Sequence, residues 1–569
     1  MWRLYVVLLQ LVAFSNFVRA TTEVYAGLRH KLTPRSNPIT IPIHVQYSRE
    51  VGDNGTVGAG WAEVASSKDQ QSYFAIIKAG AINFKVALDT ASSDLWLVSS
   101  ACNTDTCRQV PRYPLSYQSP TFLQVNSNMT SFNASYADGT FASGFLARES
   151  IELANLTVPN QPFGMVTNSN VSLTDKASGI MGLGFPRLSS IANSTLNSTS
   201  FFANLSQQGL LEYPLFAFSL TRNFSGSLSI GAVDASVVAN ASQIGWNKVA
   251  TFPPFGSESN ISSYLQWAIP LSSFSVNGTQ LTPQPTYPEI RESSLALFDI
   301  GTSGIYGPYQ DVTRLYSLIN GARLVDSSGQ WAIPCNTLAP ISFTFGSRNY
   351  TLQPSDYMIG PTTGSPDLCL SWPRALPPSS DGIDWQMGSP FLRTVYSIFS
   401  FGINNQEPPL VGLYPLQQPS NSTNTTQSSN SISSFFSANS ATVTTTLPNV
   451  LLATPTYSTP PYALNSSLSA PIGAIVSSGL ATSTYSALFG QQTSLLNTSA
   501  LPTISPTPTI FTYVLTDAVG AVTTSVSTRV AAITLGLPPG WSAASSLRSS
   551  SMTILGTLVA FLWMLDTIL

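Results

Sequence analysis

The sequence is short of charged residues and of histidine. Only 9% of its 569 residues are Asp, Glu, Lys or Arg, and the formal net charge is −3, whereas ordinary soluble domains carry about 25% charged residues. No basic patch indicates a nucleic-acid partner. The two histidines, His30 and His44, stand in no recognisable ligand or triad spacing. Catalysis by a Ser-His-Asp triad or a Cys-His pair, or at a His-based zinc site, is therefore not expected.

Cysteine is scarce as well. The chain has four cysteines, and an even number in a secreted chain predicts two disulfides. Their spacing favours Cys102–Cys107 and Cys335–Cys369. A zinc site would need a tighter second pair, so we predict neither a metal nor an organic cofactor.

With so few charges, solubility needs another source, and sequons supply one. Four sequons lie in the tail, at Asn421, Asn424, Asn465 and Asn497, and more lie before it. This density of sequons favours a glycosylated surface. The sequons before residue 417 are at Asn54, Asn128, Asn133, Asn155, Asn170, Asn193, Asn197, Asn204, Asn223, Asn240, Asn260, Asn277 and Asn349.

Two similar stretches, Phe84 to Ser93 and Leu295 to Ser303, each contain one aspartate. Asp89 and Asp299 directly follow short apolar runs typical of buried strands, and directly precede small and hydroxylated residues that suit a tight turn. Two carboxyl groups side by side cannot both ionise cheaply, so they share one proton. The ionised group can act as base on a water while the protonated group donates to a peptide carbonyl. The pair predicts an acid peptidase.

The repeat extends beyond the aspartates. An apolar-Gly pair follows each aspartate at a similar separation, with Gly182 lying 93 residues after Asp89 and Gly388 lying 89 residues after Asp299. Two features in the same order at nearly the same spacing indicate a duplicated lobe.

The chain divides by composition into six segments. Residues 1–20 have the pattern of a signal peptide, and 21–70 form an extension that is either a short pro-segment or an opening strand. Short runs of Val, Ile, Phe and Tyr, broken by Gly, Asn and Pro, predict an all-β body with lobes at 71–235 and 236–416. Asp311 to Asn320 is the best candidate for a helix.

The remainder is predicted to lie outside the body. Residues 417–541 are rich in Ser, Thr, Asn and Pro and predict an extended glycosylated stalk, with a hairpin possible over Ile510 to Val530. Small residues, a polar spacer and an apolar tail over 542–569 predict a GPI-anchor signal. The alternative for this tail is a transmembrane helix, although the run is short for a span and carries Asp566.

From about Tyr73 to Leu416 the chain resembles the pepsin-like aspartic peptidases, in particular the secreted, GPI-anchored, yapsin-type fungal enzymes. The resemblance implies a bilobal fold, an extended protein or peptide substrate in a long cleft, and a monomer at the outer membrane face or cell wall. It rests on Asp89-Thr90-Ala91-Ser92-Ser93-Asp94-Leu95-Trp96, Tyr136-Ala137-Asp138-Gly139-Thr140, Gly179 to Gly184, Phe298-Asp299-Ile300-Gly301-Thr302-Ser303 and Trp385 to Arg393.

The resemblance also implies roles for single residues. Asp89 and Asp299 would form the catalytic dyad, and Ser92 and Thr302 would bond their outer carboxylate oxygens. Tyr136 would stand on a hairpin flap whose turn contains Asp138, Gly139 and Thr140, supported by a hydrogen bond from Trp96. Asp138 on that flap either favours a basic substrate side chain or is a solvated turn residue.

Two positions depart from the family pattern. The residue after each aspartate is usually Thr or Ser, whose hydroxyl bonds the main chain of the opposite loop; Thr90 keeps this group and Ile300 does not. Ala91 stands where glycine is usual and fits only if its φ is negative. An alternative function follows, in which a catalytically impaired relative keeps the cleft as a peptide-binding or cell-wall module.

Overall fold

A computed structural model describes residues 58–68, 71–194, 199–221, 225–252, 264–289, 292–361, 367–379, 382–403, 406–416, 485–489, 500–506, 511–516, 522–527 and 533–541. The predicted signal peptide and anchor signal lie outside these residues. The described residues fall into two compact units. The smaller one is a hairpin of β29 (Phe511–Thr516) and β30 (Val522–Ser527), in the stretch predicted to form a hairpin. All other elements belong to the larger unit.

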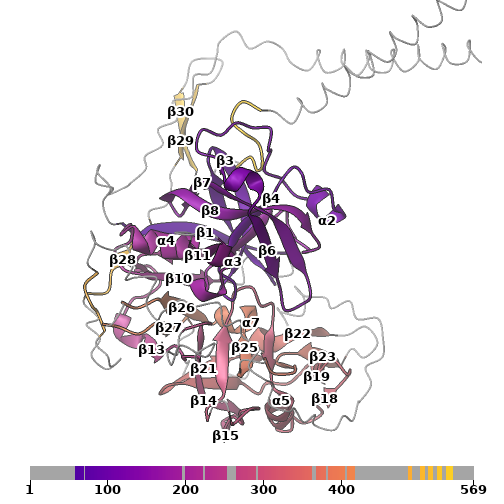
Figure 1. Ribbon diagram of the computed structural model, residues 1–569. Helices are drawn as coiled ribbons and strands as arrows, with labels where there is room; N and C mark the ends of the chain where they lie inside the picture. The colour runs from indigo at the N-terminus through magenta and orange to yellow at the C-terminus, as the bar shows by residue number, and fades with distance from the viewer. Residues whose placement is uncertain are drawn as a thin grey trace, which may run out of the picture. The chain divides into compact units, whose positions relative to one another are not determined.

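The first half of the larger unit consists mostly of strands (Figure 1). Its strands are β1 (Gly60–Ser66), β2 (Tyr73–Ala79), β3 (Ile82–Asp89), β4 (Leu95–Val98), β5 (Leu123–Gln124), β6 (Ser131–Ser135), β7 (Phe141–Leu153), β8 (Leu156–Ser169), β9 (Gly179–Gly182), β10 (Leu215–Leu220), β11 (Ser225–Ile230) and β12 (Val233–Asp234). Its short helices are α2 (Asp105–Arg108), η1 (Asn126–Asn128), η2 (Pro186–Leu188), α3 (Ser190–Ser194) and α4 (Phe201–Gln207).

The second half has the same character. Its strands are β13 (Gly245–Lys248), β14 (Ala268–Val276), β15 (Thr279–Leu281), β16 (Leu295–Phe298), β17 (Ile305–Gly307), β18 (Arg323–Leu324), β19 (Trp331–Pro334), β20 (Ile341–Phe345), β21 (Arg348–Leu352), β22 (Met358–Pro361), β23 (Leu368–Ser371), β24 (Arg374–Ala375), β25 (Ile383–Met387), β26 (Val395–Ser400) and β27 (Leu410–Pro415). Its helices are η3 (Ala241–Gln243), α5 (Tyr309–Tyr316), α6 (Pro354–Tyr357) and α7 (Ser389–Leu392). The predicted helix at Asp311 exists as α5, beginning two residues earlier.

One large sheet joins the two halves of the sequence. In its order β13-β27-β26-β10-β11-β1-β2-β3-β9-β4-β8-β7-β5, strands from the end of the body lie beside strands from its beginning, with β26 pairing antiparallel to β10. β1 is part of this sheet between β11 and β2, so Gly60–Ser66 forms an opening strand of the body. The strand-dominated architecture confirms the prediction of an all-β fold.

The duplication is visible in strand pairing. β3 runs parallel to β9, which pairs antiparallel with β4. In the second half β16 runs parallel to β25, which pairs antiparallel with β17. Each trio places the end of an aspartate-bearing strand beside the strand that carries the downstream apolar-Gly pair.

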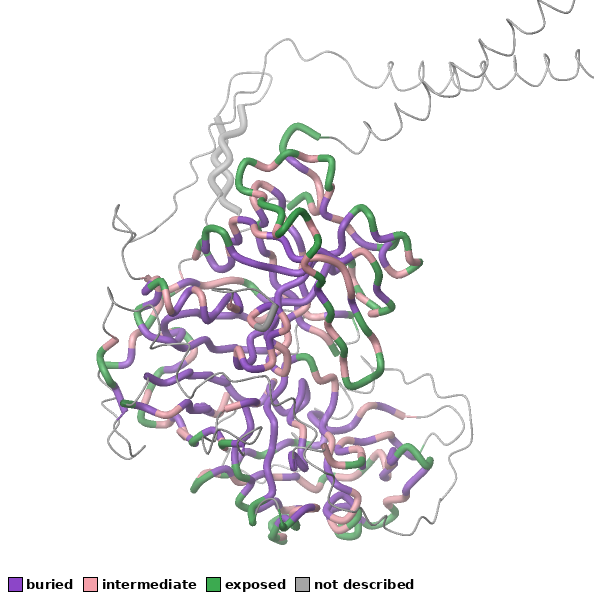
Figure 2. Tube along the Cα trace, viewed as in Figure 1, coloured by how far each residue is buried: buried purple, intermediate pink, exposed green. Residues whose placement is uncertain are grey.

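The core is apolar and continuous through both halves, and Figure 2 shows buried residues following the strands. An aromatic cluster at its centre contains Phe185, Phe216, Trp267, Phe399 and Phe401; the Phe185 and Trp267 ring centroids are 4.3 Å apart. Burial of such side chains stabilises the fold by roughly 1.5–3 kcal/mol each before entropy is counted. The cluster fixes one half of the body against the other.

Both predicted disulfides are confirmed. Cys102–Cys107 closes a loop around α2, and Cys335–Cys369 links the end of β19 to β23. Among the described residues, no helix is long and apolar enough to cross a membrane.

Three segments beyond Leu416 return to the body. Residues 485–489, 500–506 and 533–541 all contact it, and the buried side chains include Leu488, Phe489 and Leu501. These segments depart from the stalk predicted over 417–541. Composition suggested too few large apolar residues to bury, but a few spaced apolar side chains are enough when they add to an existing core rather than build a new one.

Candidate active site

Asp89 stands at the end of a half-buried strand. Residues of β3 alternate between buried and partly exposed up to Asp89. β9 holds the end of this strand in place: Asp89 pairs with Gly182, and the Leu183 amide donates to the Asp89 carbonyl at 2.8 Å. A Cβ on Gly182 would lie 2.5 Å from the Ser93 carbonyl carbon. Only glycine allows this close approach between the loop and β9.

Asp299 is delivered by the equivalent strand of the second half. All four residues of β16 are buried, and Phe298 pairs with Met387 of β25. The Asp299 amide donates to the Met387 carbonyl at 3.2 Å. A Cβ on Gly388 would lie 2.1 Å from the Thr302 carbonyl oxygen. The two aspartate loops are thus braced in the same way.

The two carboxylates face one point. A Cβ built on Gly301 would lie 3.0 Å from Asp89 Oδ1 and 3.3 Å from Asp299 Oδ1. Each of these inner oxygens also accepts a main-chain amide of its own loop, from Ala91 at 2.8 Å and from Gly301 at 2.9 Å respectively. Residues far apart in the sequence therefore form a single pair of carboxylates.

Hydroxyl groups hold the outer oxygens. Ser92 Oγ donates to Asp89 Oδ2 at 2.5 Å, and Thr302 Oγ1 donates to Asp299 Oδ2 at 2.6 Å. Charge-assisted bonds of this length are among the stronger side-chain hydrogen bonds. They fix both carboxylate planes while leaving the inner oxygens directed at the space between the loops.

The substitution at residue 300 makes the pair asymmetric. Thr90 Oγ1 accepts from the Ile300 amide at 3.1 Å, and its proton can go to the Phe298 carbonyl at 3.0 Å or to Asp299 Oδ1 at 3.2 Å. Ile300 is buried in the core and provides no equivalent hydroxyl to the first loop. The Thr90 amide donates directly to Asp299 Oδ1 at 3.3 Å, so it is not left unpaired opposite Ile300.

The Ala91 substitution is accommodated. Its φ is not among the positive values of the described residues, so its methyl group causes no left-handed strain. The side chain packs against the core.

The raised pKa of Asp89 agrees with the asymmetric hydrogen bonding of the two carboxylates. Burial and, as the next largest cause, the nearby charge of Asp299 together raise the pKa of Asp89 to about 7. Asp299 receives donors from Thr90 of the opposite loop in addition to Gly301 and Thr302 of its own. The pair can therefore hold one proton up to near-neutral pH.

Tyr136 reaches toward this pair from a hairpin. β6 pairs with β7, and Tyr136 follows β6 directly. Its hydroxyl accepts a 2.7 Å hydrogen bond from Trp96 Nε1, whose side chain is fully buried. Burial raises the pKa of Tyr136, with a further contribution from the charge of Asp89. The predicted hydrogen bond between Trp96 and the flap tyrosine is present.

The turn of this hairpin is closed by its own side chains. Asp138 Oδ1 accepts from the Thr140 amide at 2.9 Å and from Thr140 Oγ1 at 2.7 Å. Gly139 has φ +82°, a conformation that favours glycine. The Asp138 carboxylate is exposed and bonded within the turn, which supports its interpretation as a solvated turn residue.

Sequence reasoning gave no role to Asp94. It is buried, and its carboxylate accepts from the hydroxyl of Ser189 and from the amide and hydroxyl of Ser190 at 2.7 and 2.8 Å. Burial raises its pKa. Asp94 thereby ties the first aspartate loop to the start of α3. The carboxylate within the motif was visible in the sequence, but its burial and its partners were not.

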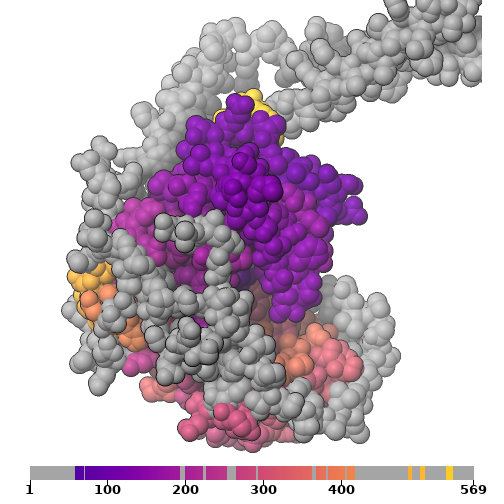
Figure 3. Space-filling model, viewed as in Figure 1, coloured from indigo at the N-terminus to yellow at the C-terminus, as the bar shows by residue number. Residues whose placement is uncertain are grey.

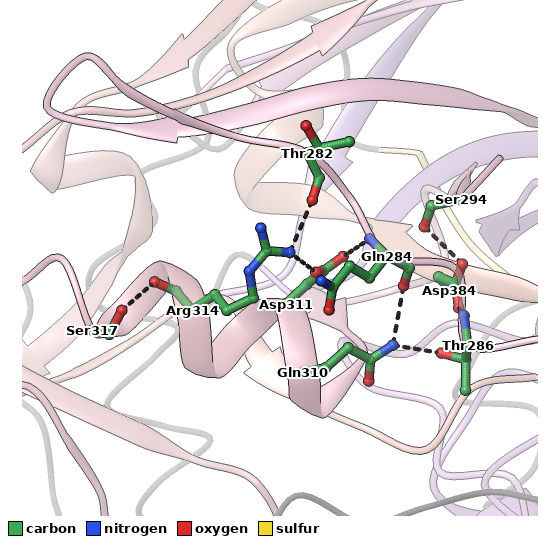
Figure 4. A network of polar contacts seen from close by, with 9 residues as sticks. All are labelled: Thr282, Gln284, Thr286, Ser294, Gln310, Asp311, Arg314, Ser317 and Asp384. Atoms are coloured by element: carbon green, nitrogen blue, oxygen red, sulfur yellow. Dashed lines mark hydrogen bonds and ion pairs between the residues drawn. The ribbon is translucent and has the colours of Figure 1, made fainter.

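A second polar network that the sequence did not reveal supports β16 (Figure 4). Asp384 accepts from Ser294 Oγ at 2.7 Å and from the Thr286 amide at 3.1 Å. It is the extra residue of a bulge, because Leu295 pairs with Ile383 but Ala296 pairs with Trp385. The network fixes the beginning of the strand that ends next to Asp299.

Asp311 on α5 extends the same network. Its buried carboxylate accepts from the Gln284 amide at 3.0 Å and from Arg314 at 2.8 Å. Gln310 Nε2 bridges the Gln284 carbonyl and Thr286 Oγ1. Burial raises the pKa of Asp311 to about 6. Together the two carboxylates hold the segment that leads into β16.

Metal chemistry has no evident site in the described part of the chain. No group of three or more His, Cys, Asp or Glu side chains there is arranged to hold a metal ion.

Comparison with known proteins decides the family. Residues 72–407 match the family described as "Eukaryotic aspartyl protease". The chain belongs to this family. Its substrates are accordingly proteins or peptides, and its function is that of an aspartic endopeptidase.

Relatives in the family are about equally distant. An aspartic protease of Phaffia rhodozyma is 30% identical over 57% of this chain and 73% of its own length. The aspartic-type endopeptidase ctsD of Aspergillus fumigatus is 31% identical over 58% of this chain and 64% of its own length. Mouse cathepsin E is 29% identical over 60% of this chain and 80% of its own length.

Proposed function

We propose that this aspartic endopeptidase cleaves peptide bonds at acidic pH with a water activated between Asp89 and Asp299. The observation that carries the proposal is that the inner oxygens of both carboxylates flank the same point, within 3.3 Å of a Cβ position on Gly301. A water between them would be in hydrogen-bonding reach of both groups.

The asymmetry of the donors supports different roles for the two aspartates. Asp89 carries the shared proton because burial and the neighbouring charge raise its pKa to about 7. Asp299, with Thr90, Gly301 and Thr302 donating to it, takes the proton of the attacking water. Asp89 then donates its proton to the oxygen of the scissile carbonyl. The water attacks directly and gives a tetrahedral diol, so no covalent enzyme intermediate forms. The C–N bond then breaks as Asp299 returns its proton to the leaving nitrogen, and a hydroxyl of the diol gives a proton back to Asp89, which restores the starting pair.

The hairpin that carries Tyr136 covers the bound peptide during the reaction. Its bond to Trp96 fixes the phenol, which lies close enough to Asp89 for the charge of that carboxylate to raise its pKa. An extended peptide below it would use main-chain hydrogen bonds and present alternate side chains to pockets on either side. Closing the hairpin excludes water and strengthens the interactions of the carboxylates. Since both aspartates belong to one chain, a monomer is sufficient.

Cleavage of a denatured protein between pH 3 and 6, with and without pepstatin, tests this function. The Asp89→Asn chain and the Asp299→Asn chain are the controls. We expect pepstatin-sensitive cleavage by the unaltered chain and at least a thousandfold less by either variant. Absence of pepstatin-sensitive, Asp89-dependent cleavage throughout this range would instead support the alternative of an impaired, peptide-binding relative.

We propose further that the protein is secreted and anchored to the outer membrane face or cell wall. The proposal rests on the signal-peptide pattern of residues 1–20, the sequons and the anchor-signal pattern of 542–569. Treatment of membranes with a phosphatidylinositol-specific phospholipase C should release the protein. A protein that stays in the membrane fraction would have a transmembrane tail.

A further inference from the structure

The surface formed by α4, β12 and the turn before β27 is covered by the chain's own C-terminal part. Two described segments lie on it, 485–489 and 500–506. Phe489 and Leu501 are 1% and 5% exposed, and both belong to the core cluster of the body. Side chains this well buried cannot belong to a stalk that extends freely into solvent.

The first segment is held by specific polar bonds as well as by apolar contact. The Phe489 amide donates to the carboxylate of buried Glu407, which also accepts from the Tyr213 hydroxyl. Tyr485 donates to the Ser206 carbonyl at 3.0 Å. The Phe489 ring lies edge-on to Trp246, with centroids 4.7 Å apart. Without this segment Glu407 would lose a donor while remaining in an apolar surrounding.

The second segment adds a strand. β28 (Thr503–Ile504) runs parallel to β12. The Val233 amide donates to the Pro502 carbonyl and the Ala235 amide to the Ile504 carbonyl, both at 2.9 Å. Pairing through alternate main-chain groups fixes the register of the segment, which apolar contact alone would not do.

A third segment contacts the first lobe. The Gly536 amide donates to the Asn83 carbonyl at 2.9 Å, on the strand that ends in Asp89. A Cβ on Gly536 would lie 2.7 Å from Pro111 Cβ, and the Trp541 ring lies edge-on to Tyr117. Figure 3 shows the yellow atoms of this part of the chain against indigo atoms of the first lobe.

We propose that these three segments form an intramolecular strap by which the C-terminal part of the chain is fastened to the peptidase body. The body then extends beyond the family match that ends at residue 407 and is complete only with the segments at 485–489, 500–506 and 533–541. If the anchor proposed above is correct, the strap also shortens the tether. A flexible coil spanning 417–541 would reach roughly 60 Å, whereas a strapped chain leaves the body near Trp541.

The strap can be tested in the full chain carrying Asp89→Asn, so that the result does not depend on peptidase activity. A recognition sequence for a site-specific protease is inserted after Gln417, and cleavage is verified under denaturing conditions. The two fragments are expected to elute together in gel filtration without denaturant. Elution of the C-terminal fragment by itself would overturn the proposal.

Charge substitutions provide the matched comparison. Phe489→Asp with Leu501→Asp should separate the fragments, whereas the same charges at the exposed positions Ala487→Asp and Thr503→Asp should not. Hydrogen exchange of the Val233 and Ala235 amides gives a second readout in the uncut chain. We expect exchange at least tenfold faster in the Phe489→Asp, Leu501→Asp chain than in the parent. Equal rates in the two chains would contradict the strap.

Discussion

Thr90 of the first aspartate loop donates to Asp299 of the second, through its amide at 3.3 Å, and its hydroxyl lies 3.2 Å from the same oxygen. The two residues are 209 positions apart. The reverse contact is absent from the hydrogen bonds of the described loops: the Ile300 amide donates to Thr90 Oγ1 instead of to Asp89, and Ile300 has no hydroxyl. One residue therefore couples the loops, and the coupling acts on the aspartate that we assign as base.

Replacing Thr90 by Val tests this coupling. The substitution removes the hydroxyl partner of the buried Ile300 amide and of the Phe298 carbonyl, and should lower the free energy of unfolding by about 1–3 kcal/mol. We also expect kcat to fall more than KM rises, because the geometry of Asp299 changes. Thr90→Ser keeps the hydroxyl and should recover most of both quantities. Equal behaviour of the two variants would show that the hydroxyl does not couple the loops.

The ionisation of Asp89 should set the upper pH limit of activity. Its pKa is raised to about 7, so it keeps the proton needed for the scissile carbonyl through the acidic range and loses it near neutrality. The dependence of kcat/KM on pH should fall on the alkaline side with an apparent pKa near 7. A fall already complete at pH 5 would contradict the assignment of the shared proton to this pair.

Asp89→Asn should stabilise the fold at neutral pH while it abolishes activity. A carboxyl whose pKa is higher in the folded chain than in the unfolded chain lowers the free energy of unfolding as pH rises between the two values, here from about 4 to about 7. An amide does not ionise, so the gain at pH 7 should be on the order of 2–4 kcal/mol and should vanish near pH 3. Denaturant unfolding at both pH values measures the difference. A gain in the free energy of unfolding of the same size at pH 3 would show that the stabilisation does not come from the ionisation of Asp89.

The bond between Trp96 and Tyr136 should matter for turnover. Trp96→Phe keeps an aromatic ring, although a smaller one, at this buried position and removes the donor to the Tyr136 hydroxyl. We expect a fall of about tenfold in kcat/KM on an extended peptide, with a smaller change in stability. In the Tyr136→Phe chain kcat/KM should fall by a similar factor, and in the double variant kcat/KM should be no lower than in the more affected single variant. Additive losses would mean that the two side chains act independently.

Asp384 should be required for stability. Asp384→Ala removes the acceptor of Ser294 and of the Thr286 amide in a buried bulge. The expected cost is about 1–3 kcal/mol in the free energy of unfolding, and Asp384→Asn should cost less because it keeps one acceptor oxygen. Asp105→Ala, at an exposed surface position, is the control. A loss no larger than that of the control would show that the network in Figure 4 does not support β16.

The sequence by itself determined the class of fold and the identity of the two aspartate loops. Apolar runs that end in Asp89 and Asp299 are local patterns, and the spacing of Gly182 and Gly388 repeats them. Local patterns of this kind persist in the fold because strand burial and turn chemistry act over a few residues. The pairing of the four cysteines was predictable for the same reason, since their spacing leaves short loops.

Only the tertiary structure decided which groups meet across the loops. The contacts from Thr90 to Asp299, the partners of Asp94 and the bulge at Asp384 depend on register between strands far apart in sequence. The return of Phe489 and Leu501 to the body was hidden for a related reason. The composition of a segment indicates whether it can form a core of its own. Burial against an existing surface depends instead on the shape of that surface and on its unpaired main-chain groups, which only the folded body presents.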